Sequence, residues 1–171
     1  MILRRAVLLV VLLLTGLVLE TSLFGGFTLT GTKPELLLLV ALALAITEGP
    51  AVGATAGFLF GLGTDVVLQL PQGIGALTFT LAAYGVGRIR GQVQSPSAWM
   101  PIVMISLTTF VAVLFYGGFS QLLGEEALPG VRILRHAGLA AAYNALLTPF
   151  LFPLIRGLAA TTRPRSTEVM R

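Results

Sequence analysis

Six apolar segments, separated by short polar stretches, are the feature that most constrains this chain. They lie at about residues 6–23, 36–47, 51–70, 74–86, 100–123 and 139–158. The chain has 171 residues, of which 56% are hydrophobic and 11% are charged, whereas roughly 25% of a soluble domain is charged. A soluble fold could not shield so much apolar surface, but a bilayer accepts it. The sequence therefore predicts an all-α polytopic membrane protein with about six transmembrane helices.

The segments group into one transmembrane domain, residues 1–160, followed by a polar tail, residues 161–171. The tail is basic, and we predict a disordered cytoplasmic segment that contacts anionic lipid. The weakest predicted span is 36–47, which at 1.5 Å per residue covers roughly 18 Å of a roughly 30 Å hydrocarbon core. Pro34 is predicted to open this helix, and Pro149 and Pro153 to bend the last one.

The distribution of basic residues predicts the orientation. With six spans and a cytoplasmic amino terminus, three of the eleven basic residues face outward, namely Lys33, Arg132 and Arg135. The other eight face inward, as the positive-inside rule requires: Arg4, Arg5, Arg88, Arg90, Arg156, Arg163, Arg165 and Arg171. A five-span arrangement without 36–47 gives a weaker bias. We therefore predict that both termini are cytoplasmic.

A stripe of small residues marks the third segment. Gly53, Gly57 and Gly61 are four residues apart, and Asp65 continues the same helix face one turn later. Membrane helices associate where small residues let their backbones approach closely. We interpret this stripe as a helix-packing or partner face. The sequence leaves open whether the contact is another helix of this chain or a separate protein.

Asp65 is the one acidic residue expected well inside a predicted helix, about five residues or roughly 7 Å from its outer end. An acid in the membrane is costly and needs a partner. One interpretation is a substrate or proton site. The other is a carboxylate that caps nearby backbone or pairs with Arg132 or Arg135. We favour the second, because proton-coupled carriers use chains of such groups and the sequence offers no others here.

The sequence contains no recognisable catalytic or metal-binding pattern. There is no cysteine, and His136 is the single histidine. A metal site would need further ligands, and no nucleophile elbow, phosphate-binding loop or dinucleotide fingerprint is present. No aromatic residues are interleaved with the basic ones, as a nucleic-acid surface would require. We predict a protein that is not an enzyme, holds no cofactor and binds no nucleic acid.

Three motifs in residues 31–88 carry a resemblance to a known family. They are Gly31-Thr-Lys-Pro34 before a leucine run, Gly53-x-x-x-Gly57-Phe58-x-x-Gly61-Leu62-x-x-Asp65, and Gly73-x-x-Ala76-Leu77-x-Phe79 followed by Ala83-Tyr84-x-x-Gly87. Together they resemble the bacterial rod shape-determining protein family MreD. Glu35 departs from the Asp or Asn that the family often has at this place. Outside residues 31–88 the likeness is limited to hydropathy.

The resemblance implies a function that the residues alone do not. Members of this family are inner-membrane scaffolds of the cell-elongation machinery that bind MreC and support peptidoglycan synthesis and cell-shape control. RodA and a class B penicillin-binding protein are further expected partners, and MreB an indirect one. The resemblance also implies a fold similar to the substrate-binding subunits of energy-coupling-factor transporters. The alternative function is therefore such a vitamin-binding subunit, which would need a ligand-sized polar cavity near the outer side.

Overall fold

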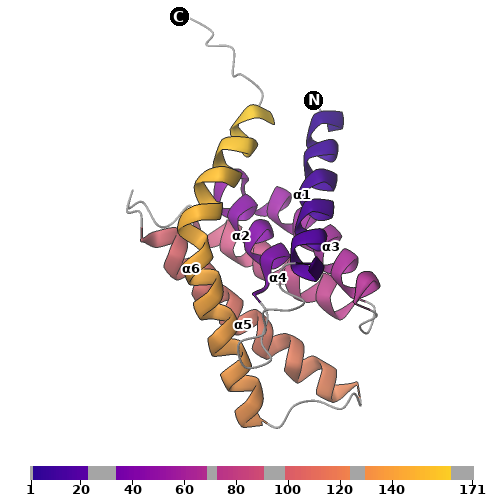
Figure 1. Cartoon of the computed structure of the whole chain (residues 1–171), viewed down its shortest axis with the longest axis vertical. Helices are drawn as coiled ribbons and strands as arrows, with labels where there is room; N and C mark the ends of the chain where they lie inside the picture. Colours follow the sequence, from indigo (N-terminus) through magenta and orange to yellow (C-terminus); the bar gives the residue numbers. More distant parts are fainter. Residues whose placement is uncertain (1, 23–33, 69–72, 91–98, 124–129, 163–171) are drawn as a thin grey trace, which may run out of the picture.

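The computed structural model describes residues 2–22, 34–68, 73–90, 99–123 and 130–162. Within these ranges the chain forms six α-helices (Figure 1): α1 Ile2–Ser22, α2 Leu36–Glu48, α3 Pro50–Val67, α4 Ile74–Ile89, α5 Met100–Leu122 and α6 Gly130–Thr162. The predicted all-helical class is confirmed. Four helices, α1, α3, α5 and α6, are long and apolar enough to cross a membrane, whereas α2 and α4 are shorter.

Successive helices run in opposite directions, so their ends gather at two ends of the bundle. Arg5 at the beginning of α1 forms a 3.2 Å ion pair with Glu48 at the end of α2. Arg90, just after α4, donates a 2.7 Å hydrogen bond from Nη1 to the Ile46 carbonyl. The beginning of α1 and the end of α6 also lie at one end of the molecule (Figure 1). We call this end, which carries Arg5, Arg88, Arg90 and Arg156, the basic end.

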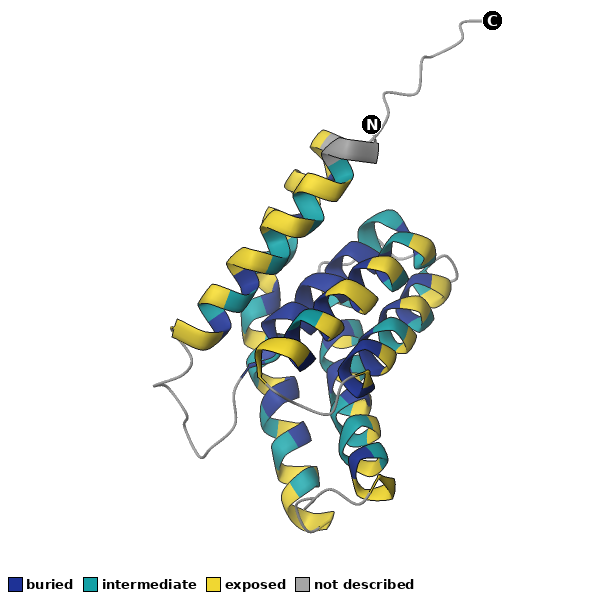
Figure 2. Ribbon diagram, turned by 90° about the vertical axis from the view of Figure 1, so that its right-hand side faces the viewer, coloured by how far each residue is buried: buried dark blue, intermediate teal, exposed yellow. Residues whose placement is uncertain are grey.

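The shortest helix, α2, lies at the centre of the bundle and contacts all five others. Every residue from Leu36 to Ala45 is buried, and Figure 2 shows buried residues concentrated in the middle of the molecule. Its 13 residues span about 20 Å, less than a bilayer core. A short helix is tolerated here because protein, and not lipid, surrounds its ends and satisfies their polar groups.

A tight turn at Glu48-Gly49-Pro50 joins α2 to α3. Gly49 alone separates α2 from α3, with φ of 109°, and donates from its N–H to the Ala45 carbonyl at 3.0 Å. A positive φ of this size favours glycine. Pro50 is the first residue of α3, where the missing N–H has no cost. Two antiparallel helices can therefore follow each other with one residue between them.

Several predicted helix boundaries were wrong. The last helix begins at Gly130, not near residue 139, and continues through Pro149 and Pro153 to Thr162. The charged stretch at its start was predicted as a loop, but Arg132 and Arg135 are exposed on the first turns of α6. At α2, Pro34 precedes the N-cap residue and does not open the helix. The predicted bending at the prolines stays a prediction, and tail residues 163–171 lie outside the described residues.

Candidate functional site

The glycine stripe of α3 is buried inside the chain, with α4 packed directly on it. A Cβ added to Gly57 would lie 2.5 Å from the Phe79 carbonyl oxygen, and one added to Gly61 would lie 2.7 Å from the Ala76 Cα. Real Cβ atoms do not approach backbone atoms so closely, so only glycine fits at these two positions. The backbones of α3 and α4 are therefore in direct contact, as small-residue stripes permit.

The same close approach continues at the basic end of the inner helices. At the basic end, a Cβ on Gly53 would lie 2.8 Å from the Ala45 Cα of α2. A Cβ on Gly87 of α4 would lie 2.5 Å from the Pro50 Cα. Gly53, Gly57 and Gly61 thus contact helices of this chain and are not available to a separate protein. Sequence reasoning missed Gly87 as a packing residue, although a glycine within an apolar helix is the signal that would have found it.

Asp65 caps the beginning of α4. Its Oδ2 accepts hydrogen bonds from the N–H groups of Gly73 at 2.9 Å and Ala76 at 3.2 Å, and its Oδ1 accepts one from Gly75 at 3.2 Å. The first N–H groups of a helix have no partner within it, and a carboxylate both satisfies them and complements the helix dipole. Asp65 is fully buried. The structure thus favours the backbone cap over an ion pair with Arg132 or Arg135, because Asp65 forms no ion pair with either arginine.

Two glycines make this cap possible. Gly73 has φ of 102°, in the left-handed region, and precedes the first residue of α4. At Gly75, a Cβ would lie 2.9 Å from the Asp65 Cγ, so a side chain there would displace the carboxylate. Asp65 also lies two residues before the end of α3 at Val67, closer to the helix end than the five residues predicted. Asp65, Gly73 and Gly75 form one structural unit.

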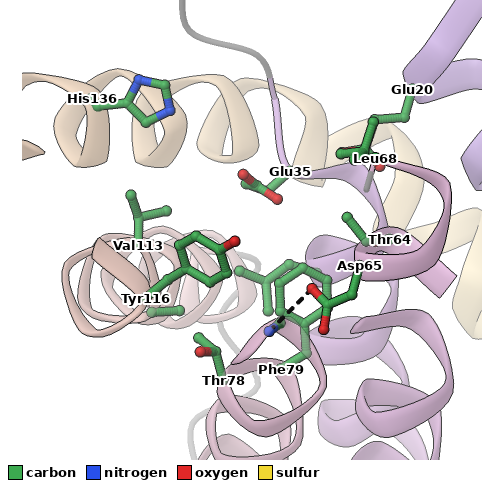
Figure 3. A pocket seen from close by; sticks show the side chains of 13 residues that line it. Glu20, Glu35, Thr64, Asp65, Leu68, Thr78, Phe79, Val113, Tyr116 and His136 are labelled. Atoms are coloured by element: carbon green, nitrogen blue, oxygen red, sulfur yellow. Dashed lines mark hydrogen bonds between the residues drawn. The ribbon is translucent and has the colours of Figure 1, made fainter. Parts of the chain in front are cut away.

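A cavity of about 240 Å³ lies beside Asp65 (Figure 3). Residues from all six helices or their caps line it: Glu20, Glu35, Leu38, Thr64, Asp65, Leu68, Gly75, Thr78, Phe79, Ala112, Val113, Tyr116 and His136. The surface that these residues expose to the cavity is mostly apolar, but each of the six elements contributes at least one polar side chain. We call the end of the bundle that contains it, opposite the basic end, the cavity end.

Four of the polar side chains that line the cavity, Glu20, Thr64, Asp65 and Thr78, are buried. Glu20 is only 6% exposed, and Glu35 is half-buried. Both line the cavity together with Asp65. Thr78 is 2% exposed, and its hydroxyl has no hydrogen-bond partner in the described part of the chain. A buried hydroxyl without a partner costs about 1–3 kcal/mol.

The Thr78 hydroxyl differs from those of neighbouring threonines. Thr64 donates to the Phe60 carbonyl at 2.9 Å, and Thr80 donates to the Ala76 carbonyl at 2.5 Å, both four residues back on the same helix. This bond is the usual way for a threonine within a helix to satisfy its hydroxyl. Thr78 forms no such bond, although its side chain lines the cavity.

A second polar contact joins the helices near the cavity. Asn144 of α6 donates from Nδ2 to the Thr109 hydroxyl of α5 at 3.0 Å and to the Glu35 carbonyl before α2 at 3.2 Å. The buried Asn144 amide therefore connects α6 to α5 and to the residue that precedes α2. Such a hydrogen bond between neighbouring helices is a common role for asparagine in membrane bundles. Within the described ranges, no cluster of three His, Cys, Asp or Glu side chains could hold a metal ion.

Comparison with protein families decides where this architecture belongs. The family model described as rod shape-determining protein MreD matches residues 2–160. The chain belongs to the MreD family. The match spans α1 to α5 and nearly all of α6, a wider range than the residues 31–88 that carry the sequence resemblance. The MreD family and the apolar helices identify a membrane protein with a role in determining rod shape.

No curated protein and no solved structure matches the chain. The similarity of fold to the substrate-binding subunits of energy-coupling-factor transporters therefore stays a prediction. The family match names a role in shape determination, and the geometry adds two features to it. These are the backbone-to-backbone packing of α2, α3 and α4 and the polar cavity at their far end.

Proposed function

We propose that this MreD-family chain is a scaffold of the cell-elongation machinery in the bacterial inner membrane. In this proposal it binds MreC and, with it, joins RodA and a class B penicillin-binding protein, and indirectly MreB. It supports peptidoglycan synthesis without catalysing a reaction. The observation that carries the proposal is the family match over residues 2–160, because fold and composition alone would fit many membrane proteins.

The packing of the bundle indicates which helices a partner can contact. The inner helices α2, α3 and α4 meet along the glycine stripe, so that face is occupied within the chain. Exposed aliphatic side chains lie on the outward faces of α3, α4 and α6, and they form rows on the outer helices α1 and α5, among them Val7, Val11 and Leu14 of α1 and Val103 and Leu107 of α5. We place the MreC contact on these outer helices and not on the glycine stripe.

The orientation in the membrane is also part of the proposal. Arg5, Arg88, Arg90 and Arg156 gather at the basic end, and the beginning of α1 and the end of α6 lie there too. The positive-inside rule then puts this end, and both termini, in the cytoplasm. The cavity end faces the outer side of the membrane.

Co-purification from bacterial membranes tests the proposal. The tagged chain, solubilised in mild detergent, should recover MreC, whereas an unrelated polytopic membrane protein with the same tag should not. Cells lacking their own family member should regain rod shape when they express the chain. Recovery of a folded chain without MreC, together with cells that stay round, would contradict the scaffold function.

The alternative function is a vitamin-binding transporter subunit. The cavity between the helices is the observation that favours it. Its volume of about 240 Å³ is below the roughly 300–1,000 Å³ of sites for drug-sized ligands. A vitamin would need a larger space, which favours the scaffold. Uptake assays in vesicles separate the two functions: we expect no vitamin uptake that depends on this chain, and such uptake would establish the transporter subunit instead.

A further inference from the structure

We propose that the cavity binds a primary ammonium group, supplied by the headgroup of an aminophospholipid or by a small free amine. The inference rests on the residues that line the cavity and on the membrane location. It does not depend on the binding of MreC. Three independent features support it: the charge of the cavity, the unpartnered Thr78 hydroxyl, and the two aromatic rings beside them.

The charge of the cavity favours a cation. Glu20, Glu35 and Asp65 bring three carboxylates to one cavity, and no lysine or arginine is among the described residues that line it. Asp65 is committed to the beginning of α4 through three backbone N–H groups. Glu20 and Glu35 line the same cavity, and a carboxylate that already holds one partner can still accept from an ammonium group through its remaining lone pairs. Carboxylates withdrawn from water are stabilised by an opposite charge nearby.

The Thr78 hydroxyl is the feature that points to a ligand and not only to a local network. It is buried, lines the cavity and has no hydrogen-bond partner in the described residues. Figure 3 shows Thr78 below Tyr116, on the side of the cavity opposite His136. An ammonium group carries three N–H donors and no acceptor. Thr78 would accept one of them, and the carboxylates would accept the others.

The remaining walls favour an organic ammonium over a metal ion. Phe79 and Tyr116 line the cavity, and aromatic faces attract ammonium groups through their quadrupole. Leu38, Leu68 and Val113 provide apolar surface for the carbon stem that carries the nitrogen. Calcium, by contrast, prefers six to eight oxygen ligands and magnesium a near-octahedral set, and this lining is mostly apolar.

The size and position of the cavity suit a headgroup. A volume of about 240 Å³ holds a small amine, but not a ligand of drug size. The cavity lies beside Asp65, two residues from the end of α3, which is about 3 Å along the helix axis. Under the proposed orientation this depth is close to the outer surface of the membrane, where phospholipid headgroups lie.

The test compares three probes on the full chain. The first two are phosphatidylethanolamine and phosphatidylcholine, each in nanodiscs with a constant phosphatidylglycerol background, and the third is free ethanolamine added in detergent. Lipid retention is measured by native mass spectrometry, and binding by the shift in thermal unfolding temperature. Phosphatidylcholine is the matched lipid control, because its quaternary nitrogen has no N–H to donate. The variants are Glu20→Gln, Glu35→Gln and Thr78→Val, with Glu48→Gln as a control at the basic end.

We expect selective retention of phosphatidylethanolamine over phosphatidylcholine. Glu35→Gln should weaken it by about tenfold or more, the effect of losing a charge-assisted bond, and Thr78→Val by about two- to tenfold. Glu48→Gln should bind as the wild type does. If ethanolamine stabilises the wild type but not Glu35→Gln, and phosphatidylethanolamine is not preferred, the source is a free amine and the proposal stands.

Equal responses of the protein to all three probes would overturn the proposal. If phosphatidylethanolamine, phosphatidylcholine and ethanolamine act equally on the wild type, the cavity does not recognise a primary ammonium group. The same conclusion follows if every variant retains the selectivity of the wild type. Thr78→Val keeps the shape of the side chain and every charge, so it provides the comparison if a glutamine variant does not fold.

Discussion

The inner helices α2, α3 and α4 and the outer helices α1, α5 and α6 are built in different ways. The inner three are the shortest in the bundle, and they approach each other at backbone distance through Gly53, Gly57, Gly61 and Gly87. The outer three are longer and expose many aliphatic side chains, as the outward faces of α3 and α4 also do. In the core of the bundle, a single added carbon atom would prevent the helices from packing. On its surface, any apolar side chain of suitable length can face the lipid.

This difference explains why the family motifs are concentrated where they are. Residues 31–88, which carry the sequence resemblance, encompass the three inner helices. Close packing between backbones tolerates only glycine or alanine at the contact, so it requires particular residues at particular positions. A helix that faces lipid needs length and hydropathy, which many sequences supply. Outside residues 31–88 the likeness is correspondingly limited to hydropathy.

The largest effect is expected from a bulky residue on the inner stripe. Gly57→Leu or Gly61→Leu should destabilise the chain by about 3 kcal/mol or more, because backbone atoms of α4 cannot move aside as flexible side chains do. The matched control is Gly138→Leu on α6, where an added Cβ meets nothing within 4 Å. Thermal unfolding in detergent measures both. If the inner and outer variants are equally stable, the inner helices do not depend on glycine at their contacts and the difference between the two sets of helices is wrong.

A smaller effect is expected at the cap of α4. Asp65→Asn replaces one accepting oxygen with an NH₂ group and removes the charge that three N–H groups share. We expect a loss of about 1.5–3 kcal/mol in unfolding free energy, as for hydrogen bonds to a charged group. The double variant with Arg135→Ala should show additive losses, because no ion pair joins the two residues. Strong non-additivity would indicate an ion pair instead of a backbone cap.

The smallest effect is expected where one outer helix is tied to the core. Asn144→Ala removes the bonds to Thr109 and to the Glu35 carbonyl. Buried bonds between membrane helices are worth about 0.6–2 kcal/mol, so the unfolding temperature should fall slightly. Thr109→Val should cause part of the same loss. A loss as large as that of Gly57→Leu would show that α6 belongs to the core.

Part of this architecture could be predicted from the sequence and part could not. Apolar segments are local signals, so they predicted the number of helices, and Gly49-Pro50 is a local signal of the same kind for the α2–α3 turn. The start of α6 was missed because Arg132 and Arg135 resemble loop residues, although they are exposed on a helix. The partner of Asp65 and the cavity depend on contacts between distant segments. Glu20, Thr78 and His136 are far apart in the sequence, and only the fold brings them together.

The central claim is that the short helices α2 and α4 cross the membrane with the four longer ones. The chain has no cysteine, so single-cysteine variants at Gln72 and Gln94 can report on each side separately. In intact cells with an impermeant thiol reagent, Gln72→Cys should react, and Gln94→Cys should react only after the cells are permeabilised. If Gln72→Cys is protected, or Gln94→Cys is labelled in intact cells, at least one of the two short helices does not cross and the six-span arrangement is wrong.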